Sequence, residues 1–485
     1  MLDPEACYRA LAAHDRRFDG RFYTAVTTTG VYCRPVCRAP LPKPRNVRFF
    51  ACAAAAEEAG FRPCRRCRPE AAPGSPAWAG TSATVTRALR LIEGGALDGG
   101  GVESFAARLG VSSRYLRRLF AEQLGASPHS VALTRRVHLA RRLIDETSLP
   151  MTEVALAAGF TSVRRFNHAI RSTYRGSPTT LRRGRAPLDG GDGWELHLPA
   201  RSPLDGAGML GFLGERAIPG VEAVEGDTYR RTFSLGETRG ALAVRVVAGE
   251  PFVILRVHVD RPCPLLPIIE RVSRMFDLGT DSEDIAAHLA RDPALARVLK
   301  GRKDVRVVGA WDPFELAVRA ILGQQVSVRG ARTLAGRLAQ AFGSRVEGVS
   351  APALGFLFPV PESLAESRLD GIGIPGARAL AIRSLAAAVA SRALDFASLG
   401  GLEEAVERLT ALPGFGEWTA QYVAMRALGE PDAFPAGDLG VRRALARGGR
   451  LPSLREARAR AERWRPWRAY AVMALWTRPS ERRRS

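Results

Sequence analysis

The chain has 485 residues, 46% of them hydrophobic, so it is too long for one core and too apolar to be disordered, and three or four packed domains are expected. Its net charge of +22, almost all of it from arginine, makes a polyanion the expected partner. No run reaches the roughly eighteen uncharged apolar residues of a membrane span and no secretion signal is recognised, so we expect a cytoplasmic protein without a membrane partner.

The first segment, residues 1–78, mixes strand-like and helical patterns. Residues 22–26 have the pattern of a strand and residues 51–59 that of a short alanine-rich helix. A unit of this size buries little apolar surface, so we expect a bound metal to contribute to its stability.

Four of the seven cysteines form two close pairs in this segment, Cys33 with Cys37 and Cys64 with Cys67. Such spacing places two pairs on two turns, as a tetrahedral zinc site requires, and predicts one Zn²⁺ held by all four thiolates. Most closed four-thiolate sites are structural, but zinc keeps its thiols deprotonated, so each ligand is also a potential nucleophile and exposure decides which one reacts.

The residues around both pairs, Val31-Tyr-Cys33-Arg-Pro-Val-Cys37 and Gly60-Phe-Arg-Pro-Cys64-Arg-Arg-Cys67, resemble the amino-terminal domain of the Ada family. The resemblance implies that Cys33 irreversibly accepts a methyl group from a methylphosphotriester in the DNA backbone. Zinc with four thiolates carries a charge of −2, and methylation would reduce it to −1. The resemblance therefore implies a switch in which alkylation of Cys33 strengthens DNA binding.

The second segment, residues 82–185, is expected to be all-helical and carries 17 arginines, no lysine and seven acidic residues. Residues 104–120 read as helix, glycine-containing turn and helix, the pattern of a helix-turn-helix, and residues 152–178 contain a second such unit. Together the two units resemble an AraC-type DNA-binding domain. The alternative is a helical bundle whose basic face only meets solvent.

An AraC-type domain implies distinct roles for its buried and exposed residues. The expected core residues are Leu116, Leu119, Phe120, Phe160 and Phe166. The side chains expected toward the DNA groove are those of Arg114, Arg117, Ser162 and Arg164. We expect promoter DNA as the partner, together with RNA polymerase, although non-specific DNA binding would need the same charge.

The carboxyl half begins with strands and then becomes helical. Residues 242–247 and 252–259 read as strands, and the pattern is helical beyond residue 264. Residues 410–422 have the form of a helix-hairpin-helix, in which Gly414 and Gly416 permit a turn whose backbone N–H groups can face a phosphate. Asp438 follows in a Gly/Pro-rich loop. By itself it would be read as the N-cap of a helix over residues 439–446.

This half resembles AlkA, a member of the helix-hairpin-helix DNA glycosylases, through Met209-Leu-Gly-Phe-Leu213 and Ala320-Ile-Leu-Gly-Gln-Gln325 among other segments. The resemblance implies a partly β domain at residues 192–292 and a glycosylase domain at residues 293–485. It makes Asp438 the catalytic carboxylate and assigns an aromatic base pocket to Trp418, Tyr422 and Trp476. Gln325 occupies the position of the wedge that fills the gap left by the extruded base, where AlkA has leucine.

The reaction implied is hydrolysis of the N-glycosidic bond of alkylated bases of the 3-methyladenine type. An aromatic pocket suits a base made cationic by methylation, and Asp438 can stabilise an oxocarbenium-like sugar without any cofactor. Trp418 stands where bifunctional relatives have lysine, so we expect a monofunctional enzyme without strand cleavage.

The whole chain is thus expected to be a multidomain α+β protein that acts as a monomer on alkylated double-stranded DNA and activates transcription. Two other interpretations stay open. In one, the carboxyl half only recognises damage and the chain is purely a regulator, which makes Asp438 dispensable. In the other, the chain is a structural zinc protein with a helical DNA-binding region, and methylated DNA cannot alkylate Cys33.

Overall fold

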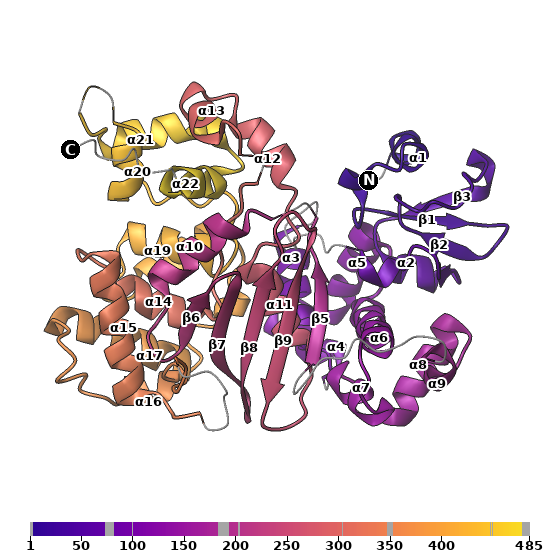
Figure 1. Ribbon diagram of the computed structural model, residues 1–485, viewed down its shortest axis with the longest axis horizontal. Helices are drawn as coiled ribbons and strands as arrows, with labels where there is room; N and C mark the ends of the chain where they lie inside the picture. The colour runs from indigo at the N-terminus through magenta and orange to yellow at the C-terminus, as the bar shows by residue number, and fades with distance from the viewer. Residues whose placement is uncertain are drawn as a thin grey trace. The chain divides into compact units, whose positions relative to one another are not determined.

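The computed structural model describes residues 3–72, 82–98, 100–182, 194–201, 204–302, 304–346, 353–446, 448 and 450–477. Its contacts divide the chain into two compact units (Figure 1). Unit 1 comprises Met1–Arg201 with Ile254–Glu270, and unit 2 comprises Ser202–Val253 with Arg271–Ser485. None of the helices in the described ranges combines the length and apolarity needed to cross a bilayer.

Unit 1 begins with a four-stranded sheet in the order β3-β1-β2-β4. Strands β1 and β2 are antiparallel, as are β1 and β3, whereas β2 and β4 run parallel. The elements here are α1 (Pro4–Ala12), η1 (Arg16–Phe18), β1 (Tyr23–Val26), β2 (Val31–Cys33), η2 (Pro44–Asn46), β3 (Val47–Phe50), α2 (Ala53–Glu58), β4 (Arg62–Pro63) and η3 (Pro69–Ala71).

Seven helices follow, and the long helix α6 joins two helix-turn-helix units. In each unit a glycine with positive φ makes the turn, Gly110 at +71° and Gly159 at +83°. The five predicted core residues, from Leu116 to Phe166, are all buried. The helices are α3 (Ala83–Glu93), α4 (Val102–Arg108), α5 (Ser113–Leu124), α6 (Pro128–Glu146), α7 (Met151–Ala157), α8 (Val163–Tyr174) and α9 (Pro178–Arg182).

Helix α2 belongs to two hydrophobic cores at once. Ala53 and Ala56 pack with Tyr23 and Tyr32 in the core of the small sheet. Ala54 and Ala55, on the other side of the helix, pack in the same cluster as the buried residues of α3, α4 and α5. The cysteine-containing segment and the first helix-turn-helix unit therefore share one apolar interior, and a change in the position of α2 affects both.

Strand β5 (Trp194–Pro199) neighbours β9 (Phe252–Val259), and most of this pair belongs to unit 1. In unit 2, β6 (Glu222–Glu225), β7 (Thr228–Leu235) and β8 (Thr238–Val246) form an antiparallel meander. The strands predicted at residues 22–26, 242–247 and 252–259 are confirmed as β1, β8 and β9.

The rest of unit 2 is helical, as predicted. Its helices are α10 (Gly206–Arg216), α11 (Leu266–Met275, which begins in unit 1), α12 (Ser282–Leu289), α13 (Pro293–Leu299), α14 (Pro313–Leu322), α15 (Val328–Phe342), α16 (Pro361–Ala365), α17 (Gly376–Ala390), η4 (Phe396–Ser398), α18 (Leu402–Thr410), α19 (Glu417–Arg426), α20 (Leu439–Ala444), α21 (Leu454–Ala461), η5 (Glu462–Trp464) and α22 (Arg468–Trp476).

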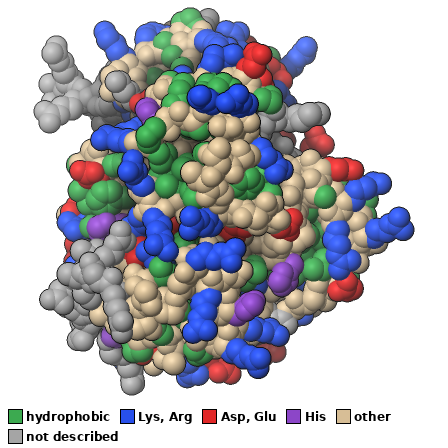
Figure 2. Space-filling view, turned by 90° about the vertical axis from the view of Figure 1, so that its right-hand side faces the viewer, with side chains coloured by type: hydrophobic (Ala, Val, Ile, Leu, Met, Phe, Trp, Pro, Cys, Tyr) green, Lys and Arg blue, Asp and Glu red, His purple; other side chains and the backbone are tan. Residues whose placement is uncertain are grey.

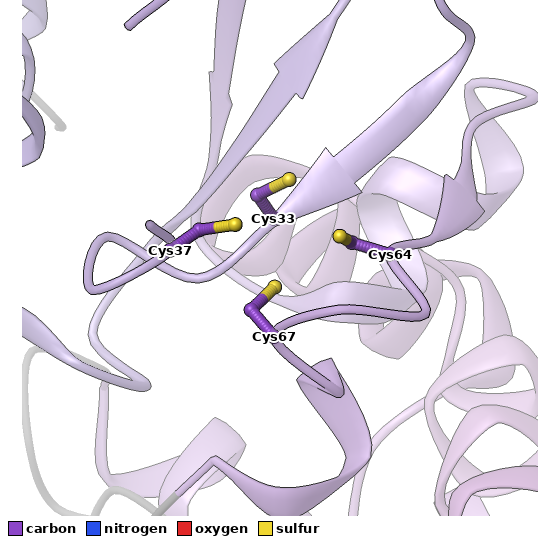
Figure 3. A group of neighbouring side chains, drawn as sticks. All are labelled: Cys33, Cys37, Cys64 and Cys67. Carbon is purple, nitrogen blue, oxygen red and sulfur yellow. The ribbon is translucent and has the colours of Figure 1, made fainter. Parts of the chain in front are cut away.

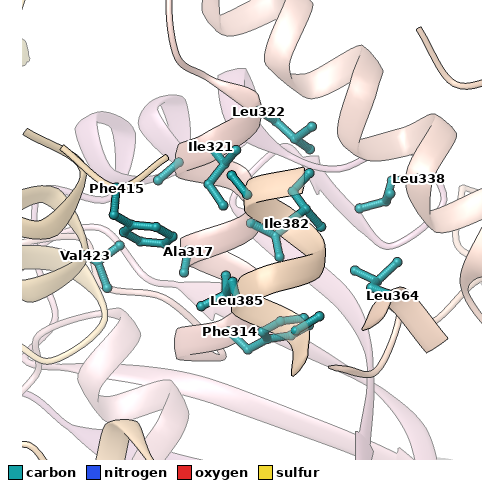
Figure 4. Close-up of a cluster of buried hydrophobic side chains, with 14 of the residues drawn as sticks. Phe314, Ala317, Ile321, Leu322, Leu338, Leu364, Ile382, Leu385, Phe415 and Val423 are labelled. Atoms are coloured by element: carbon teal, nitrogen blue, oxygen red, sulfur yellow. The ribbon is translucent and has the colours of Figure 1, made fainter. Parts of the chain in front are cut away.

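The core of unit 2 surrounds α14. Phe314, Ala317 and Ile321 of α14 pack against residues of α15, α16, α17 and α19 (Figure 4). The hairpin residue Phe415 belongs to this core and is 5% exposed, so its side chain attaches the loop before α19 to the core. The loop before α19 is thus packed on the helical core of unit 2.

A buried ion network also fixes α14 to the meander. Arg231 of β7 donates to Glu315 at 2.7 Å, and Arg319 donates to Glu222 of β6 at 2.9 Å. Removing one partner would leave an uncompensated buried charge, which is strongly destabilising. The network therefore helps to fix the position of α14, which ends at Leu322, three residues before the predicted wedge.

The sequence is Pro/Gly/Ser-rich at residues 72–80, 184–193 and 350–361, a composition that predicts domain boundaries or long surface loops, with the first two expected to be linkers. The first two stretches lie almost wholly outside the described residues. The third, residues 350–361, is described from residue 353. Its last residue begins α16. The helix expected after Asp438 is present but ends at Ala444, two residues earlier than predicted.

Asp277 provides a test of the packing in unit 2. Burial, opposed by Arg306, raises the pKa of this carboxyl from 3.8 to about 6. Since the raised pKa belongs to the folded state, protonation favours folding, and this contribution is lost as the pH rises through 6. As the pH rises from about 5 to about 8, the free energy of unfolding should fall in the wild type, and we expect this fall to be about 1 kcal/mol smaller in the Asp277→Asn variant.

Urea unfolding followed by tryptophan fluorescence at both pH values measures the difference. The exposed Asp370→Asn variant serves as the matched control. An identical pH dependence in Asp277→Asn and wild type would contradict the assignment of this shift to Asp277.

Candidate functional site

The four predicted cysteines converge on one point in unit 1. Their sulfur atoms all lie within 4.8 Å of one another, and the side chains point toward a common centre (Figure 3). Parallel pairing of β2 with β4 aligns Tyr32 with Pro63, so Cys33 and Cys64 follow directly at the ends of neighbouring strands. The backbone N–H of Cys64 donates to the carbonyl of Tyr32 at 3.0 Å and keeps this alignment.

Each cysteine pair lies on a turn closed by the backbone. Cys37 N–H donates to the carbonyl of Arg34 at 3.1 Å, and Arg68 N–H donates to that of Cys64 at 3.1 Å. Zn–S bonds of roughly 2.3 Å in a tetrahedron bring sulfur atoms slightly less than 4 Å apart, which this arrangement accommodates. The donor set and its geometry thus fit one Zn²⁺, as predicted.

Exposure alone does not single out the reactive thiol. Cys37 is buried, but Cys33, Cys64 and Cys67 are all partly buried. Four thiolate sulfurs within 4.8 Å of one another would repel strongly. A cation is therefore needed to keep all four sulfurs deprotonated.

Arg34, next to Cys33, distinguishes one of the other sulfurs. Its backbone N–H donates to Cys67 Sγ at 3.4 Å, and its guanidinium donates to the carbonyl of Cys67 at 3.1 Å and pairs with the buried Asp19. A thiolate that accepts a hydrogen bond is a weaker nucleophile, because its negative charge is partly neutralised. This contact makes Cys67 less reactive.

A buried polar cluster joins the cysteine site to α6. The hydroxyl of Tyr32 donates to Glu57 at 2.8 Å and lies 3.1 Å from His138 Nε2, and Thr134 donates to the other oxygen of Glu57 at 2.7 Å. Burial would raise the pKa of Glu57, but hydrogen bonding and charge attraction from His138, with the two hydroxyls, lower it. The residue that precedes Cys33 is thus bonded through Glu57 to the helix between the two DNA-binding units.

The second cysteine turn also contacts the helical region. Arg65 donates to the carbonyl of Tyr174, the last residue of α8, at 3.1 Å. Arg68, in the left-handed region at φ +51°, pairs with the buried Asp145 of α6 at 3.0 Å. Both turns of the metal site are therefore attached to the DNA-binding helices.

The four side chains predicted to face the DNA groove are all exposed. Arg114 and Arg164 lie on α5 and α8. Arg117 already pairs with Glu103 at 2.9 Å, and the hydroxyl of Ser162 caps α8 by accepting from Arg165 N–H at 3.3 Å. These two therefore have structural partners in addition to any contact with DNA.

The same helices expose further side chains that sequence reasoning missed. Tyr115 is 40% exposed with the Arg118 guanidinium 5.1 Å from its ring centroid, and Val163, 38% exposed, begins α8. Arg165 and His168 are also exposed on α8. Figure 2 shows Lys and Arg side chains spread over one face of the molecule.

In unit 2 the hairpin between α18 and α19 requires Gly414. Its φ is +77°, and a Cβ there would lie 2.5 Å from the Cβ of Ala381. Gly416 has extended backbone and is the N-cap residue of α19, so the start of this helix has no side-chain cap in the described structure. The first N–H groups of α19 are therefore available for an anion such as a phosphate.

Asp438 is held by three donors at the start of α20. The indole Nε1–H groups of Trp418 and Trp476 donate to its two carboxylate oxygens, at 3.1 Å to Oδ2 and 2.9 Å to Oδ1. Val441 N–H donates to Oδ1 at 2.8 Å. The N-cap role and a position among the predicted pocket aromatics are thus compatible.

The three predicted pocket residues lie together. Trp418 and Tyr422 are stacked with centroids 5.4 Å apart, and Tyr422 lies 6.0 Å from Trp476 at an interplanar angle of 50°. All three are partly buried. The structure therefore brings the predicted carboxylate and the predicted aromatic side chains into one cluster.

Three residues without a predicted role complete the cluster. Phe212 stacks with Trp476 at 6.3 Å, and the guanidinium groups of Arg216 and Arg426 lie 3.8 and 4.8 Å from its ring centroid. Arg426 also donates to the Tyr422 hydroxyl at 2.6 Å. Burial raises the pKa of Tyr422, but Arg426 and Arg216 outweigh it and the net shift is downward. Phe212 could have been found, because it lies in the quoted Met209–Leu213 segment.

Gln325, the predicted wedge, lies on the exposed turn between α14 and α15. It has φ +55°, and its neighbours Val326 and Val328 are 38% and 43% exposed. Exposed apolar side chains beside a protruding residue suit insertion into a base stack.

Family comparisons divide the chain into four matching regions. Residues 6–70 match the metal binding domain of Ada, and residues 105–184 match a helix-turn-helix domain. Residues 195–312 match the AlkA N-terminal domain, and residues 318–469 match the HhH-GPD superfamily of base excision DNA repair proteins.

Individual proteins resemble either the whole chain or its second half. A Mycobacterium tuberculosis protein described as a probable bifunctional transcriptional activator/DNA repair enzyme AlkA is 44% identical over 98% of this chain and 96% of its own length. DNA-3-methyladenine glycosylase 2 of Escherichia coli is 36% identical over 56% of this chain and 94% of its own length. The structure of a 3-methyladenine DNA-glycosylase from Archaeoglobus fulgidus shares the fold, with a TM-score of 0.50 at 24% identity over 58% of this chain and 97% of that one.

Removing zinc from the zinc-loaded protein tests the shared core. Without the metal the four thiols must take up protons, and the turns around Cys33 and Cys64 lose their common ligand. We expect a chelator to increase amide hydrogen exchange in α2 and, through Ala54 and Ala55, in α5. Exchange-mass spectrometry measures both segments, with α14 of unit 2 as internal control. Unchanged exchange in α5 while α2 becomes exposed would contradict the coupling through the shared core.

Proposed function

Because this chain belongs to the family of bifunctional transcriptional activator/DNA repair proteins that join an Ada-type zinc domain to an AlkA-type glycosylase, we propose that it performs two repair reactions on alkylated DNA. One transfers a methyl group from the DNA backbone to Cys33, and the other releases alkylated bases at Asp438. The same chain binds promoter DNA and activates transcription, acting as a monomer together with RNA polymerase.

In the first reaction the Cys33 thiolate attacks the methyl carbon of a methylphosphotriester. The S–C bond forms as the C–O bond breaks, the phosphodiester leaves as an anion, and Cys33 becomes a neutral thioether. Bound zinc supplies the charge that keeps the four thiols deprotonated before the transfer. The donation from Arg34 N–H to Cys67 Sγ favours attack by a different sulfur.

The transfer also changes the charge next to the DNA-binding helices. One thiolate fewer weakens the repulsion between the cysteine site and phosphate, so affinity for DNA rises. Tyr32 and Arg65 attach the two cysteine turns to α6 and α8, so the charge change occurs within the DNA-binding unit itself.

The position of Asp438 carries the proposal for base release. A purine methylated at N3 or N7 is cationic, and the faces of Trp418, Tyr422 and Trp476 can stack on it. As the C1′–N bond breaks, the base leaves as a neutral molecule and positive charge develops on the sugar. The Asp438 carboxylate, oriented by two indole N–H groups, stabilises this charge and accepts a proton from the water that adds to C1′.

The reaction proposed is a hydrolysis without strand cleavage. A lyase step through a Schiff base requires an amine, and the sequence contains no lysine after Lys303. Trp418, at the start of α19, stacks on Tyr422 and donates to Asp438, so it belongs to the binding pocket.

The Asp438→Asn variant tests base release. It keeps the shape of the side chain but removes the charge, so we expect 3-methyladenine release from methylated duplex DNA to fall at least about 100-fold under single-turnover conditions. Asp370→Asn, an exposed change in the same unit, should release base at the wild-type rate. Undiminished release by Asp438→Asn would mean that this carboxylate is not catalytic, and no release by folded wild type would favour a purely regulatory protein.

Intact-mass and peptide analysis after incubation with methylated DNA tests the acceptor. We expect one added methyl group per chain, located on Cys33, because the family resemblance assigns the acceptor there and the Arg34 N–H bond makes Cys67 a weaker nucleophile. Cys33→Ser should take up none, while Cys7→Ser, outside the ligand set, should be modified like wild type. A methyl group found on Cys64 or Cys67 instead would show that the nucleophile was assigned wrongly.

A further inference from the structure

The turn that carries Gln325 is attached to the rest of unit 2 by its neighbour Gln324. The turn begins at Gly323, the C-cap of α14, and ends at Ser327, whose hydroxyl caps α15 by accepting from Gly330 N–H at 3.1 Å. Residues 325–329 are all exposed. The helix ends fix both sides of the turn. Gln324 connects the turn to the neighbouring elements through its side chain and its backbone carbonyl.

That side chain makes two hydrogen bonds to the hairpin region. Gln324 Nε2 donates to the carbonyl of Gly414 at 2.9 Å and to Thr419 Oγ1 at 3.1 Å. A carbonyl oxygen can only accept, so the amide nitrogen must face Gly414, and the orientation of the carboxamide is determined. On the backbone side, Arg378 of α17 donates to the carbonyl of Gln324.

Both acceptors lie in parts of the molecule with assigned roles. Gly414 is the residue of the hairpin that cannot be replaced without a collision with Ala381. Thr419, 2% exposed, directly follows Trp418 on α19. One carboxamide therefore bridges the turn of Gln325, the phosphate-facing hairpin and the helix that carries two pocket aromatics.

Gln325 itself needs such support. Its left-handed backbone conformation, at φ +55°, is strained for a residue other than glycine and persists only where the surroundings hold it. The bonds of Gln324 and the cap made by Ser327 hold the two sides of this residue. A wedge must fill the gap in the base stack while the hairpin grips the backbone and the pocket receives the base, so its position relative to both matters.

We propose that Gln324 is a positioning residue for base extrusion, which keeps the wedge turn in register with the hairpin and with α19. This inference rests on the glycosylase function proposed above. Gln324 takes no part in breaking the glycosidic bond. Its loss slows extrusion of a paired base and leaves a base that is already unpaired almost unaffected.

The test compares two substrates and a matched pair of variants. Single-turnover release of 7-methylguanine is measured from a duplex in which the base is paired and from one in which it lies in a single-nucleotide bulge, where extrusion costs less. Gln324→Ala removes both bonds, and Gln324→Glu keeps the shape without the donor. Gln340→Ala and Gln340→Glu, at an exposed position of α15, control for the change in side chain and charge.

We expect both Gln324 variants, which lose both hydrogen bonds, to release the paired base at least about tenfold more slowly. Release from the bulge should fall less than about twofold, and the Gln340 variants should match wild type on both substrates. Thr419→Ser, which keeps the acceptor, should behave as wild type. Thr419→Val, which retains the bond to Gly414, should lie between wild type and Gln324→Ala.

An equal loss on both substrates would overturn the positioning role, since it would place Gln324 in the chemical step or in the folding of the unit. No loss on either substrate would overturn it as well. These outcomes differ from failure of the proposed function, in which wild type itself releases no base from either duplex.

Discussion

The two groups proposed to react, Cys33 and Asp438, are anions that would act beside a polyanion. The thiolates around Cys33 and the carboxylate of Asp438 lie in a protein whose net charge is +22, so attraction to phosphate comes from elsewhere on the surface. Each anion must therefore be held by short-range contacts. Two indole N–H groups and a backbone N–H donate to Asp438, and zinc would bind the thiolates. The fold is organised to supply these donors at fixed places.

The two sites use this constraint differently. In the proposed base release the charge of Asp438 is permanent, because stabilising a cationic sugar requires it in every reaction cycle. In the proposed methyl transfer the charge of Cys33 is consumed, because a thiolate becomes a thioether. A permanent charge suits a catalyst and a consumable charge suits a switch. The cysteine turns are attached to α6 and α8, so the consumable charge lies where it can alter DNA binding.

The amino-acid sequence predicted many of the elements, and the structure brings the predicted cysteines together and the predicted aromatics to Asp438. Close cysteine spacing, helix-turn-helix glycines and the hairpin pattern are local features that a sequence shows. It could not predict contacts between distant segments. Phe212 and Arg216 reach the aromatic cluster from α10, about 200 residues before Trp418 in the chain. The sharing of α2 between two cores and the bridge from Gln324 to Gly414 likewise depend on tertiary packing. Exposure, expected to distinguish the reactive cysteine, does not, since Cys33, Cys64 and Cys67 all belong to the partly buried class.

The central claim is that one chain carries a stoichiometric and a catalytic repair reaction. It is tested most directly by incubating the protein with excess duplex DNA carrying isotope-labelled methyl groups and measuring label on the protein and in free bases over time. The account predicts that protein-bound label stops at one methyl per chain while released methylated bases continue to accumulate well beyond one per chain. Released bases that also stop at one per chain, or protein that stays unlabelled, would contradict it.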